Sequence, residues 1–248
     1  MKTFLSPSKF TILIWHILAT VLFFMFAIIG SLQEWIIAII LYFIHTTIGG
    51  TVMFHRFLSH KSFNAPLWFQ YLGTIIGSLG GNGSGIAWAA VHREHHRYTD
   101  TDKDPHNPHH KGFLWTQFCS FNHTPNLKYV PDLLRNKFQV KVHTNYWLIN
   151  LIYVLILFLI DPKAILYAYF VPAFLTWHAG SFINTVGHSI GYRNAITKDT
   201  STNNFVTGYL VSGEGWHNNH HADPKNPNFG KKWYEFDLGY QIIKLVRM

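Results

Sequence analysis

Four long stretches without a charged residue limit the folds that this chain can adopt. They contain the predicted membrane-spanning helices, which cover residues 11–30, 35–54, 145–160 and 164–184. A helix needs about 20 mostly apolar residues to cross a bilayer, and each stretch approaches or exceeds that length. Charged residues make up 13% of the chain, against roughly 25% in typical globular domains, so a water-facing surface would lack charges. The sequence therefore predicts an all-α integral membrane protein whose four transmembrane helices form two hairpins.

Basic residues set the expected orientation of these helices. Lysines and arginines collect in the long segments 55–141 and 188–248, and Lys2 and Lys9 precede the first span. By the positive-inside rule these regions are cytoplasmic. They are expected to form a helical cytoplasmic cap, so that residues 1–248 make a single membrane domain. The start lacks a small-residue cleavage site, so the first hairpin is expected to be retained rather than cleaved as a signal peptide.

The interval 62–92 is also free of charge and is rich in glycine. Two crossings would need roughly 40 residues, which this interval does not have. A single crossing would put His55 and His92 on opposite sides of the membrane. We therefore expect a buried or interfacial hairpin that does not cross, with a fifth span as the alternative.

Three short segments rich in histidine follow the predicted spans. Their histidines are His55 and His60 in HRFLSH, His92, His95 and His96 in HREHH, and His217, His220 and His221 in HNNHH. Residues i, i+3 and i+4 lie on one helix face, so each of the last two segments is expected to direct its three imidazoles at one point. The i, i+5 spacing in HRFLSH shares no face on an ideal helix, so the helix is expected to end between its two histidines.

A ninth histidine follows the fourth predicted span. In NTVGH, Asn184 and His188 are four residues apart and are expected on the cytoplasmic extension of that helix. All nine histidines then lie near the cytoplasmic membrane surface. Two transition-metal ions with four or five nitrogen ligands each would use them all, and imidazole suits iron, copper, zinc and nickel. Zinc would imply hydrolysis or structure, whereas iron adds oxygen chemistry, which fits a site beside unreactive hydrocarbon.

The remaining histidines have simpler explanations. His16, His45 and His178 are expected to be core residues of the spans. The polar segment TDTDKDPHNPHH, residues 99–110, predicts a loop whose histidines are solvated or support the ligands. The single cysteine, Cys119, excludes an internal disulfide.

In this order and context, HRFLSH, HREHHRYTDTDKDPHNPHHKGF, NTVGH and GEGWHNNHH resemble the motifs of the membrane fatty-acid desaturases, in particular their Δ9 (stearoyl-type) branch. The resemblance covers about residues 35–230. It implies two iron ions whose ligands are His55, His60, His92, His95, His96, His188, His217, His220 and His221, without assigning each ligand to one iron. It also implies that Asn184 holds a water on one iron. Asp102, Asp104, Asn107, Glu214 and Trp216 are expected to support these ligands.

The resemblance further implies O2-dependent removal of two hydrogens from a saturated acyl chain, which leaves a cis double bond, expected at Δ9. The animal acyl-CoA members of the family carry a basic–acidic pair before the second box, where this chain has Ala90 and Val91. The later stretch CSFNHTPNLKYV, where those members carry a basic cluster, has Lys128 as its one lysine or arginine. This difference weakens the expectation of an acyl-CoA head group and leaves lipid-linked and carrier-protein-linked chains as alternatives.

The expected partners are a fatty-acyl substrate, membrane lipid and a separate electron donor. The chain has neither the HPGG heme motif of a fused cytochrome b5 nor a nicotinamide-binding glycine turn, so a ferredoxin or cytochrome b5 is implied. The bacterial inner membrane is the expected location, with the endoplasmic reticulum second. The net charge is +8, but no run of lysine and arginine is interleaved with polar residues, so no nucleic acid partner is expected.

Two other functions compete with this interpretation. A related membrane di-iron hydroxylase or oxygenase of lipids would have similar histidine boxes, and its product would be an alcohol rather than an alkene. A non-enzymatic metal-binding or transport protein would need polar groups in the middle of the spans, where this chain offers His16, His45 and His178.

Overall fold

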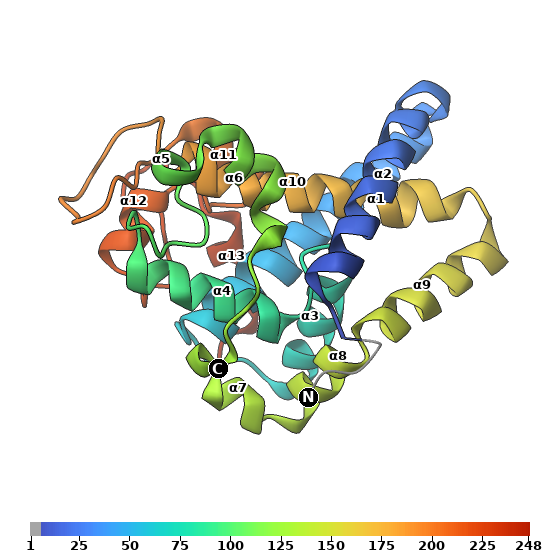
Figure 1. Cartoon of the computed structure of the whole chain (residues 1–248), viewed down its shortest axis with the longest axis horizontal. Coiled ribbons are helices and arrows are strands. Elements are labelled where there is room, and N and C mark those ends of the chain that lie inside the picture. The colour runs from blue at the N-terminus through green and yellow to red at the C-terminus, as the bar shows by residue number, and fades with distance from the viewer. Residues whose placement is uncertain (1–5) are drawn as a thin grey trace.

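A computed structural model describes residues 6–248, and all regular structure in this range is helical (Figure 1). Isolated bridges pair Tyr192 with Asn203 and Asn203 with Trp216, without forming a strand among the described residues. The all-α prediction is therefore confirmed for this part of the chain. Lys2, which entered the argument on orientation, lies outside the described residues.

The α-helices are α1 (Lys9–Ile29), α2 (Leu32–Ile44), α3 (Leu67–Leu79), α4 (Gly85–Tyr98), α5 (Pro108–Lys111), α6 (Phe113–Cys119), α7 (Pro131–Arg135), α8 (Lys137–Thr144), α9 (Tyr146–Ile160), α10 (Val171–Val186), α11 (Phe205–Leu210), α12 (His217–Ala222) and α13 (Leu238–Val246). The π-helices are η1 (His45–Ser59) and η4 (Leu166–Phe170), and the 3₁₀-helices are η2 (Ser120–Asn122) and η3 (Leu127–Tyr129).

Helices α1 and α2 correspond to the first predicted hairpin. Ser8 and Ser31 begin them, and each hydroxyl accepts a hydrogen bond from a backbone N–H of the first turn, which would otherwise lack a partner. α2 continues into η1 without a break. Both Lys9–Ile29 and Leu32–Ser59 are long and apolar enough to cross a membrane, in agreement with the first two predicted spans.

The third and fourth predicted spans correspond to α9 and to η4 with α10. α9 has 15 residues and reaches spanning length only together with α8, from which it is bent by 68°. The described residues therefore hold two helices able to cross a membrane, or three if this bent pair is one span. The arrangement of four spans in two hairpins stays a prediction.

An ion pair joins the two short turns of the predicted hairpins. Lys163 Nζ, in the turn before η4, lies 2.7 Å from Glu34 Oε1, at the start of α2. Figure 1 shows the α1–α2 turn and the far end of α9 on the right-hand side, away from α12 and α7. The apolar helices thus extend from one side of a body formed by the shorter helices.

The glycine-rich interval 62–92 forms α3 and the first half of α4. With 13 and 14 residues, these helices are shorter than a membrane span, as the prediction of a non-crossing hairpin requires. α3 packs closely on η1, since a Cβ atom on Gly49 would lie 2.5 Å from Gly77 Cα. Glycine at these two positions lets the backbones of η1 and α3 approach closely.

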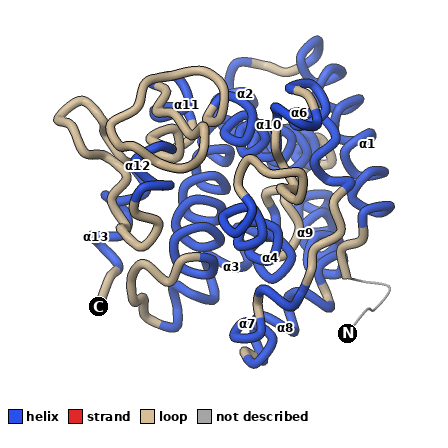
Figure 2. The backbone as a smooth tube through the Cα atoms, turned by 60° about the vertical axis from the view of Figure 1, so that its left-hand side comes forward, coloured by secondary structure: helices blue, strands red, loops and turns tan. Residues whose placement is uncertain are grey.

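The shorter helices are packed around the ends of η1 and α10. Val52, Phe54 and Leu58 of η1 belong to one buried cluster with Ile86 and Ala89 of α4. Figure 2 shows long loops around α11 and α12, on the opposite side of the molecule from α1. The packing brings together four histidine-bearing segments that are far apart in the sequence: η1, α4, the end of α10 and α12.

Candidate metal centre

The nine histidines that the sequence singles out lie in two compact groups. The five-histidine group comprises His55, His60, His92, His96 and His220, and the four-histidine group comprises His95, His188, His217 and His221. Within each group, one ring nitrogen of every histidine lies within 4.8 Å of the corresponding nitrogens of the others. The structure therefore brings all nine imidazoles together and divides them between two centres.

The π-helical turn of η1 aligns the histidines of HRFLSH. A π-helix bonds each carbonyl to the N–H five residues on, and His60 N–H donates to the His55 carbonyl at 3.1 Å. Their ring centroids are 4.9 Å apart. The helix ends at Ser59, between the two histidines, as expected, and His60 caps it. The unusual i, i+5 spacing thus matches the hydrogen-bond spacing of a π-helix.

The expectation that each HxxHH segment converges on one point is wrong. His92 and His96 of α4 belong to the five-histidine group, whereas His95 belongs to the other. α12 divides its three histidines in the opposite sense: His217 and His221 join the four-histidine group and His220 joins the five. Consecutive residues of a helix point about 100° apart, so a helix lying between two centres serves both.

Nitrogen atoms face one another within the five-histidine group. Nε2 of His220 lies 3.0 Å from Nε2 of His55 and 2.9 Å from Nε2 of His96, and the Nε2 atoms of His60 and His92 are 2.7 Å apart. Glu214 Oε2 lies 2.5 Å from His55 Nδ1. An ionised carboxylate only accepts hydrogen bonds, so Nδ1 donates and Nε2 of His55 keeps its lone pair. A cation between these nitrogens would satisfy them together.

Three carboxylates surround the four-histidine group. Asp104 Oδ1 accepts from His95 Nδ1 at 2.9 Å, and Asp199 Oδ2 accepts from His221 Nδ1 at 3.0 Å. Asp100 Oδ1 lies 3.3 Å from His188 Nδ1. Such contacts orient an imidazole and raise its basicity as a ligand.

Burial favours the neutral form of several of these imidazoles. The pKa is lowered well below its usual value by burial, and further by neighbouring imidazoles, at His92, His96, His217 and His220. Burial lowers the pKa of His221 to about 4, although Asp199 acts against it. Burial alone would raise the pKa of Asp104, but the adjacent His95 outweighs it and holds this pKa below its usual range. Neutral imidazoles beside ionised carboxylates have the lone pairs that a metal ion needs.

The residues present fit a pair of divalent metal ions. His95 Nε2 and His221 Nε2 are buried and have no hydrogen-bond partner among the described residues, while the Nδ1 atom of each is bonded to a carboxylate. Buried polar atoms without partners are rare, and a ligand is a usual reason for them. The carboxylates of Asp100, Asp104, Asp199 and Glu214 carry four negative charges, which match the charge of two divalent ions, although Arg56 Nη2, 3.5 Å from Glu214, shares one of them.

The predicted supporting residues divide into two classes. Asp104 and Glu214 contact ligand imidazoles, as described above. Asp102 is exposed, and Asn107 caps α5 by accepting from the backbone of His109 and His110. Trp216 is fully buried and donates from Nε1 to the Phe236 carbonyl at 2.9 Å, which is a packing role at the start of α12.

Asn184 and His188 lie on different elements. α10 carries Asn184 but ends at Val186, so His188 falls in the turn that follows rather than on the helix itself. Gly187 lies between α10 and the His217 ring, since a Cβ atom there would lie 2.9 Å from His217 Cδ2. The turn therefore depends on glycine to bring His188 and His217 together, with their Nε2 atoms 3.0 Å apart.

Two supporting carboxylates were missed by sequence reasoning. Asp100 belongs to the same TDTDKD run as Asp102, but it has a φ of 61°, in the left-handed region that aspartate tolerates better than most residues. Asp199 lies in the loop before α11, held by the hydroxyl groups of Thr197 and Ser201. The alternation of aspartates was a usable signal for Asp100, whereas nothing local marks Asp199.

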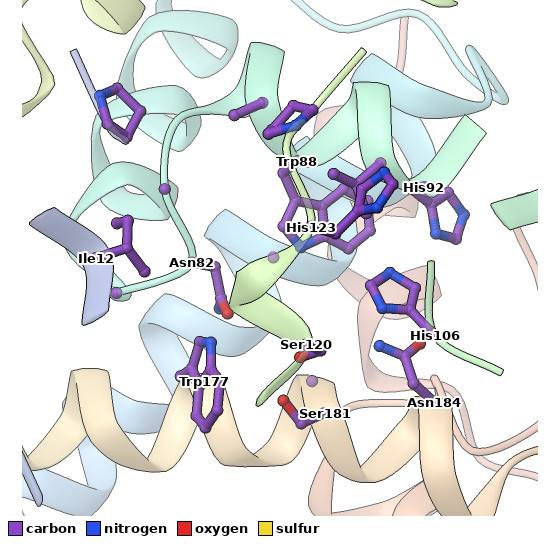
Figure 3. A pocket seen from close by; sticks show the side chains of 18 of the residues that line it. Ile12, Asn82, Trp88, His92, His106, Ser120, His123, Trp177, Ser181 and Asn184 are labelled. Carbon is purple, nitrogen blue, oxygen red and sulfur yellow. The ribbon is translucent and has the colours of Figure 1, made fainter. Parts of the chain in front are cut away.

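A cavity of about 1000 Å³ leads to the histidines. Figure 3 shows Ile12, Asn82 and Trp177 on one side of it and His92, His106 and Asn184 on the other, with Trp88 between them. His55, His217 and Glu214 also line it. His106, in the loop before α5, has a buried Nδ1 without a partner among the described residues. The cavity thus places a bound molecule against both histidine groups.

Comparison with known proteins agrees with this geometry. The family model described as fatty acid desaturase matches residues 33–245. The chain is 36% identical over 217 residues to sn-1 stearoyl-lipid 9-desaturase of Synechocystis sp., a match covering 85% of this chain and 68% of that protein. It is 34% identical over 233 residues to sn-1 stearoyl-lipid 9-desaturase of Anabaena variabilis, covering 90% and 85%.

A third relative is sn-2 palmitoyl-lipid 9-desaturase of Nostoc sp., which is 33% identical over 219 residues, 84% of this chain and 76% of that protein. The matched range contains every histidine of both groups. The family model covers most of the chain, and these relatives are aligned over most of their own length. The chain therefore belongs to the fatty acid desaturase family, and it is an oxidoreductase that acts on fatty acyl chains.

Proposed function

We propose that this protein uses O2 and two iron ions to introduce a cis double bond at Δ9 of a saturated acyl chain. The observation that carries the proposal is the pair of histidine groups at one side of a largely apolar cavity. Iron held there would supply the oxidant that removes hydrogen from an unactivated methylene pair. The nine histidines are its ligands in this proposal, and Asn184, which lines the same cavity, holds a water on one iron.

Other residues of the chain orient the imidazole rings and line the cavity for the acyl chain. Asp100, Asp104, Asp199 and Glu214 hold imidazole rings through Nδ1, which leaves Nε2 directed at the centre. Trp88, Trp177 and Ile12 contribute apolar lining that fixes the register of an acyl chain. Stacking of Trp88 on His92, with centroids 4.8 Å apart, joins that lining directly to the five-histidine group.

We propose further that the acyl chain is linked to a lipid. Lys9 is the only lysine or arginine among the described residues that line the cavity, whereas coenzyme A carries several phosphate charges. The relatives named as stearoyl-lipid and palmitoyl-lipid desaturases support the same choice. A relative named acyl-CoA C20 Delta5-desaturase, from Anemone leveillei, is 35% identical, so the experiment has to separate the two substrates.

The proposed setting is the bacterial inner membrane, with four spans in two hairpins and the cap in the cytoplasm. The Glu34–Lys163 ion pair supports it, because both short turns then lie at the same membrane surface. Lysines and arginines outside those turns follow the positive-inside rule. A separate ferredoxin or cytochrome b5 delivers electrons to the cytoplasmic face.

The test is the fatty-acid profile of bacterial cells that express the chain together with a ferredoxin and its reductase. The proposal predicts new cis-9 monounsaturated chains, which disappear in the His220→Ala/His221→Ala variant. In a pulse with labelled stearate, the label should become unsaturated in glycerolipid before it does so in acyl-CoA. Hydroxylated chains would instead favour the hydroxylase alternative, and unchanged lipid despite bound iron would refute the proposed reaction.

A further inference from the structure

An exposed aromatic surface lies beside the last histidine box. Four residues of the short helix α11 belong to it, and three more come from the segment that follows α12: Phe205, Val206, Tyr209, Leu210, Trp233, Tyr234 and Phe236. Trp233 is 94% exposed, and Val206 and Leu210 are more than half exposed. We call these residues the α11 surface. Exposed apolar patches of this kind mark contact with a partner or a membrane.

Its residues form one continuous surface rather than scattered side chains. The Phe205 and Tyr234 rings have centroids 5.5 Å apart, as do those of Trp233 and Tyr234. Tyr209 Oη donates to the Tyr234 carbonyl at 2.5 Å, which fastens α11 to the later segment. Positions 205, 206, 209 and 210 share one face of the helix, so the apolar side chains of α11 point the same way.

The opposite face of α11 is buried against the histidine-bearing region. Thr207 and Gly208 are buried, and a Cβ atom on Gly208 would lie 2.6 Å from the Trp216 ring. Asn204, at the start of α11, accepts a backbone hydrogen bond from Thr207, and its N–H donates to the Gly215 carbonyl at 2.8 Å. The α11 surface is therefore fixed rigidly to the turn that leads into α12.

The α11 surface also adjoins the predicted spans. Tyr42 Oη, in the helical rod Leu32–Ser59, donates to the Leu210 carbonyl at 2.6 Å. α11 packs on α10 as well. Because α11 lies directly against the predicted spans, its exposed apolar face is expected to contact the bilayer that surrounds them.

Two lysines lie next to the aromatic residues of the α11 surface, as is typical of segments that bind a membrane interface. Lys231 and Lys232 directly precede Trp233 and are exposed. Lys232 Nζ lies 5.8 Å from the centre of the Tyr234 ring. Tryptophan and tyrosine favour the headgroup level of a bilayer, and lysines beside them favour anionic lipid.

We propose that the α11 surface lies in the interfacial region of the membrane and contacts lipid, with Lys231 and Lys232 at anionic headgroups. Its partner is therefore a phospholipid surface. This contact fixes α12, and so His217, His220 and His221, at a set height above the bilayer through the Gly208–Trp216 packing. The proposal requires only that the protein lies in a bilayer, and it is independent of the reaction.

Site-directed quenching in vesicles tests this contact. In a Cys119→Ser background, a fluorophore is attached at Trp233→Cys, at Val206→Cys and at the control Ile196→Cys. Ile196 is a matched control, because it is an apolar residue exposed by 103% in the loop between α10 and α11, outside the α11 surface. The protein is reconstituted in phosphatidylethanolamine–phosphatidylglycerol vesicles, and nitroxide lipid and aqueous iodide serve as quenchers.

We expect nitroxide lipid to quench the probes at positions 206 and 233 about threefold more strongly than the probe at 196, and iodide to show the reverse order. Lysine contact with anionic lipid adds a second readout. Lys231→Glu/Lys232→Glu, or exchange of phosphatidylglycerol for phosphatidylcholine, should weaken lipid quenching at position 233, whereas the exposed-lysine control Lys225→Glu should not.

Two results would overturn the proposal. Equal iodide quenching at positions 196, 206 and 233 would mean that the α11 surface faces water. Protection of positions 206 and 233 from both quenchers would mean that protein, such as a second copy of this chain, covers the surface instead of lipid.

Discussion

The five-histidine and four-histidine groups differ in how many carboxylates contact their imidazole rings. In the five-histidine group, Glu214 is the one carboxylate among the described residues that is bonded to a ring, and it also lies close to Arg56. In the four-histidine group, Asp100, Asp104 and Asp199 each lie against a different ring. The five-histidine group thus offers more imidazole nitrogens to a metal ion. The four-histidine group offers fewer nitrogens but has more carboxylates around its rings.

This contrast indicates two inequivalent metal positions. Neutral ligands leave the charge of a metal ion uncompensated, and carboxylates around the ligands offset it. The four-histidine group also has one nitrogen fewer, and Asn184 lines the same cavity as its member His217. We therefore expect each centre to respond to its own set of substitutions, while the reaction needs both.

The largest effect is expected from removing one imidazole of either group. His220→Ala takes away the Nε2 atom that faces both His55 and His96, and His217→Ala does the same opposite His188. Each variant should lower bound iron from about two to about one per chain and reduce product by at least about 100-fold. Iron by mass spectrometry and fatty acids by gas chromatography measure the two quantities.

His110→Ala is the matched control, since His110 is exposed and lies outside both groups. It should retain both irons and normal product. Retention of two irons by His220→Ala would show that the two centres do not divide as the geometry indicates.

The next effect concerns the carboxylates. Asp199→Asn should weaken iron binding at the four-histidine group about 10- to 100-fold, because His221 loses the charge that orients it. Glu214→Gln should weaken the five-histidine group in the same way through His55. Competition with a graded series of chelators measures the affinity of each centre. If both variants lowered the iron affinity of the same centre, the assignment of Asp199 and Glu214 to different histidine groups would be wrong.

A glycine substitution sharpens the comparison further. Gly187→Ala should displace the His217 ring and destabilise the protein by about 1–3 kcal/mol, with iron lost from the four-histidine group first. Gly180→Ala, within α10, is the control, since its added Cβ atom would meet only Asn82 Oδ1, at 3.9 Å. Thermal denaturation in detergent compares the two. Equal stability of both variants would mean that Gly187 is not required for close packing.

The smallest effect separates neighbouring aspartates. Asp102→Asn should change neither iron content nor product, because Asp102 is exposed. Asp100→Asn should weaken the four-histidine group, because Asp100 lies against His188 and its hydrogen bonds from Thr200 hold the loop before α11. Iron content after a mild chelator wash distinguishes them, and loss of iron from Asp102→Asn alone would reverse the assignment.

Much of this site could be predicted from sequence because its pattern is local. The spacing of HREHH and HNNHH places imidazoles on helices, and the order of four motifs identifies the family. The split of each segment between two centres could not be predicted, since it depends on where α4 and α12 pack. Glu214 and Asp104 stand within or near the motifs, whereas Asp199 reaches His221 from a loop whose sequence carries no metal signal.

The fold shows the same division between local and long-range information. Apolar length predicts spanning helices at 11–30 and 35–54, and the structure has helices long and apolar enough to span at Lys9–Ile29 and Leu32–Ser59. It does not predict that the second becomes a π-helix from His45, nor that Gly49 in this π-helix packs closely on Gly77 of α3. The bend of 68° between α8 and α9 likewise has no counterpart in a hydropathy pattern.

The most direct test of two inequivalent iron centres is a Mössbauer spectrum of the purified protein loaded with ⁵⁷Fe. We predict two quadrupole doublets of equal area, one of which is lost in His217→Ala while the other remains. A single doublet that disappears as a whole in this variant, or iron that binds without involving these histidines, would contradict the account.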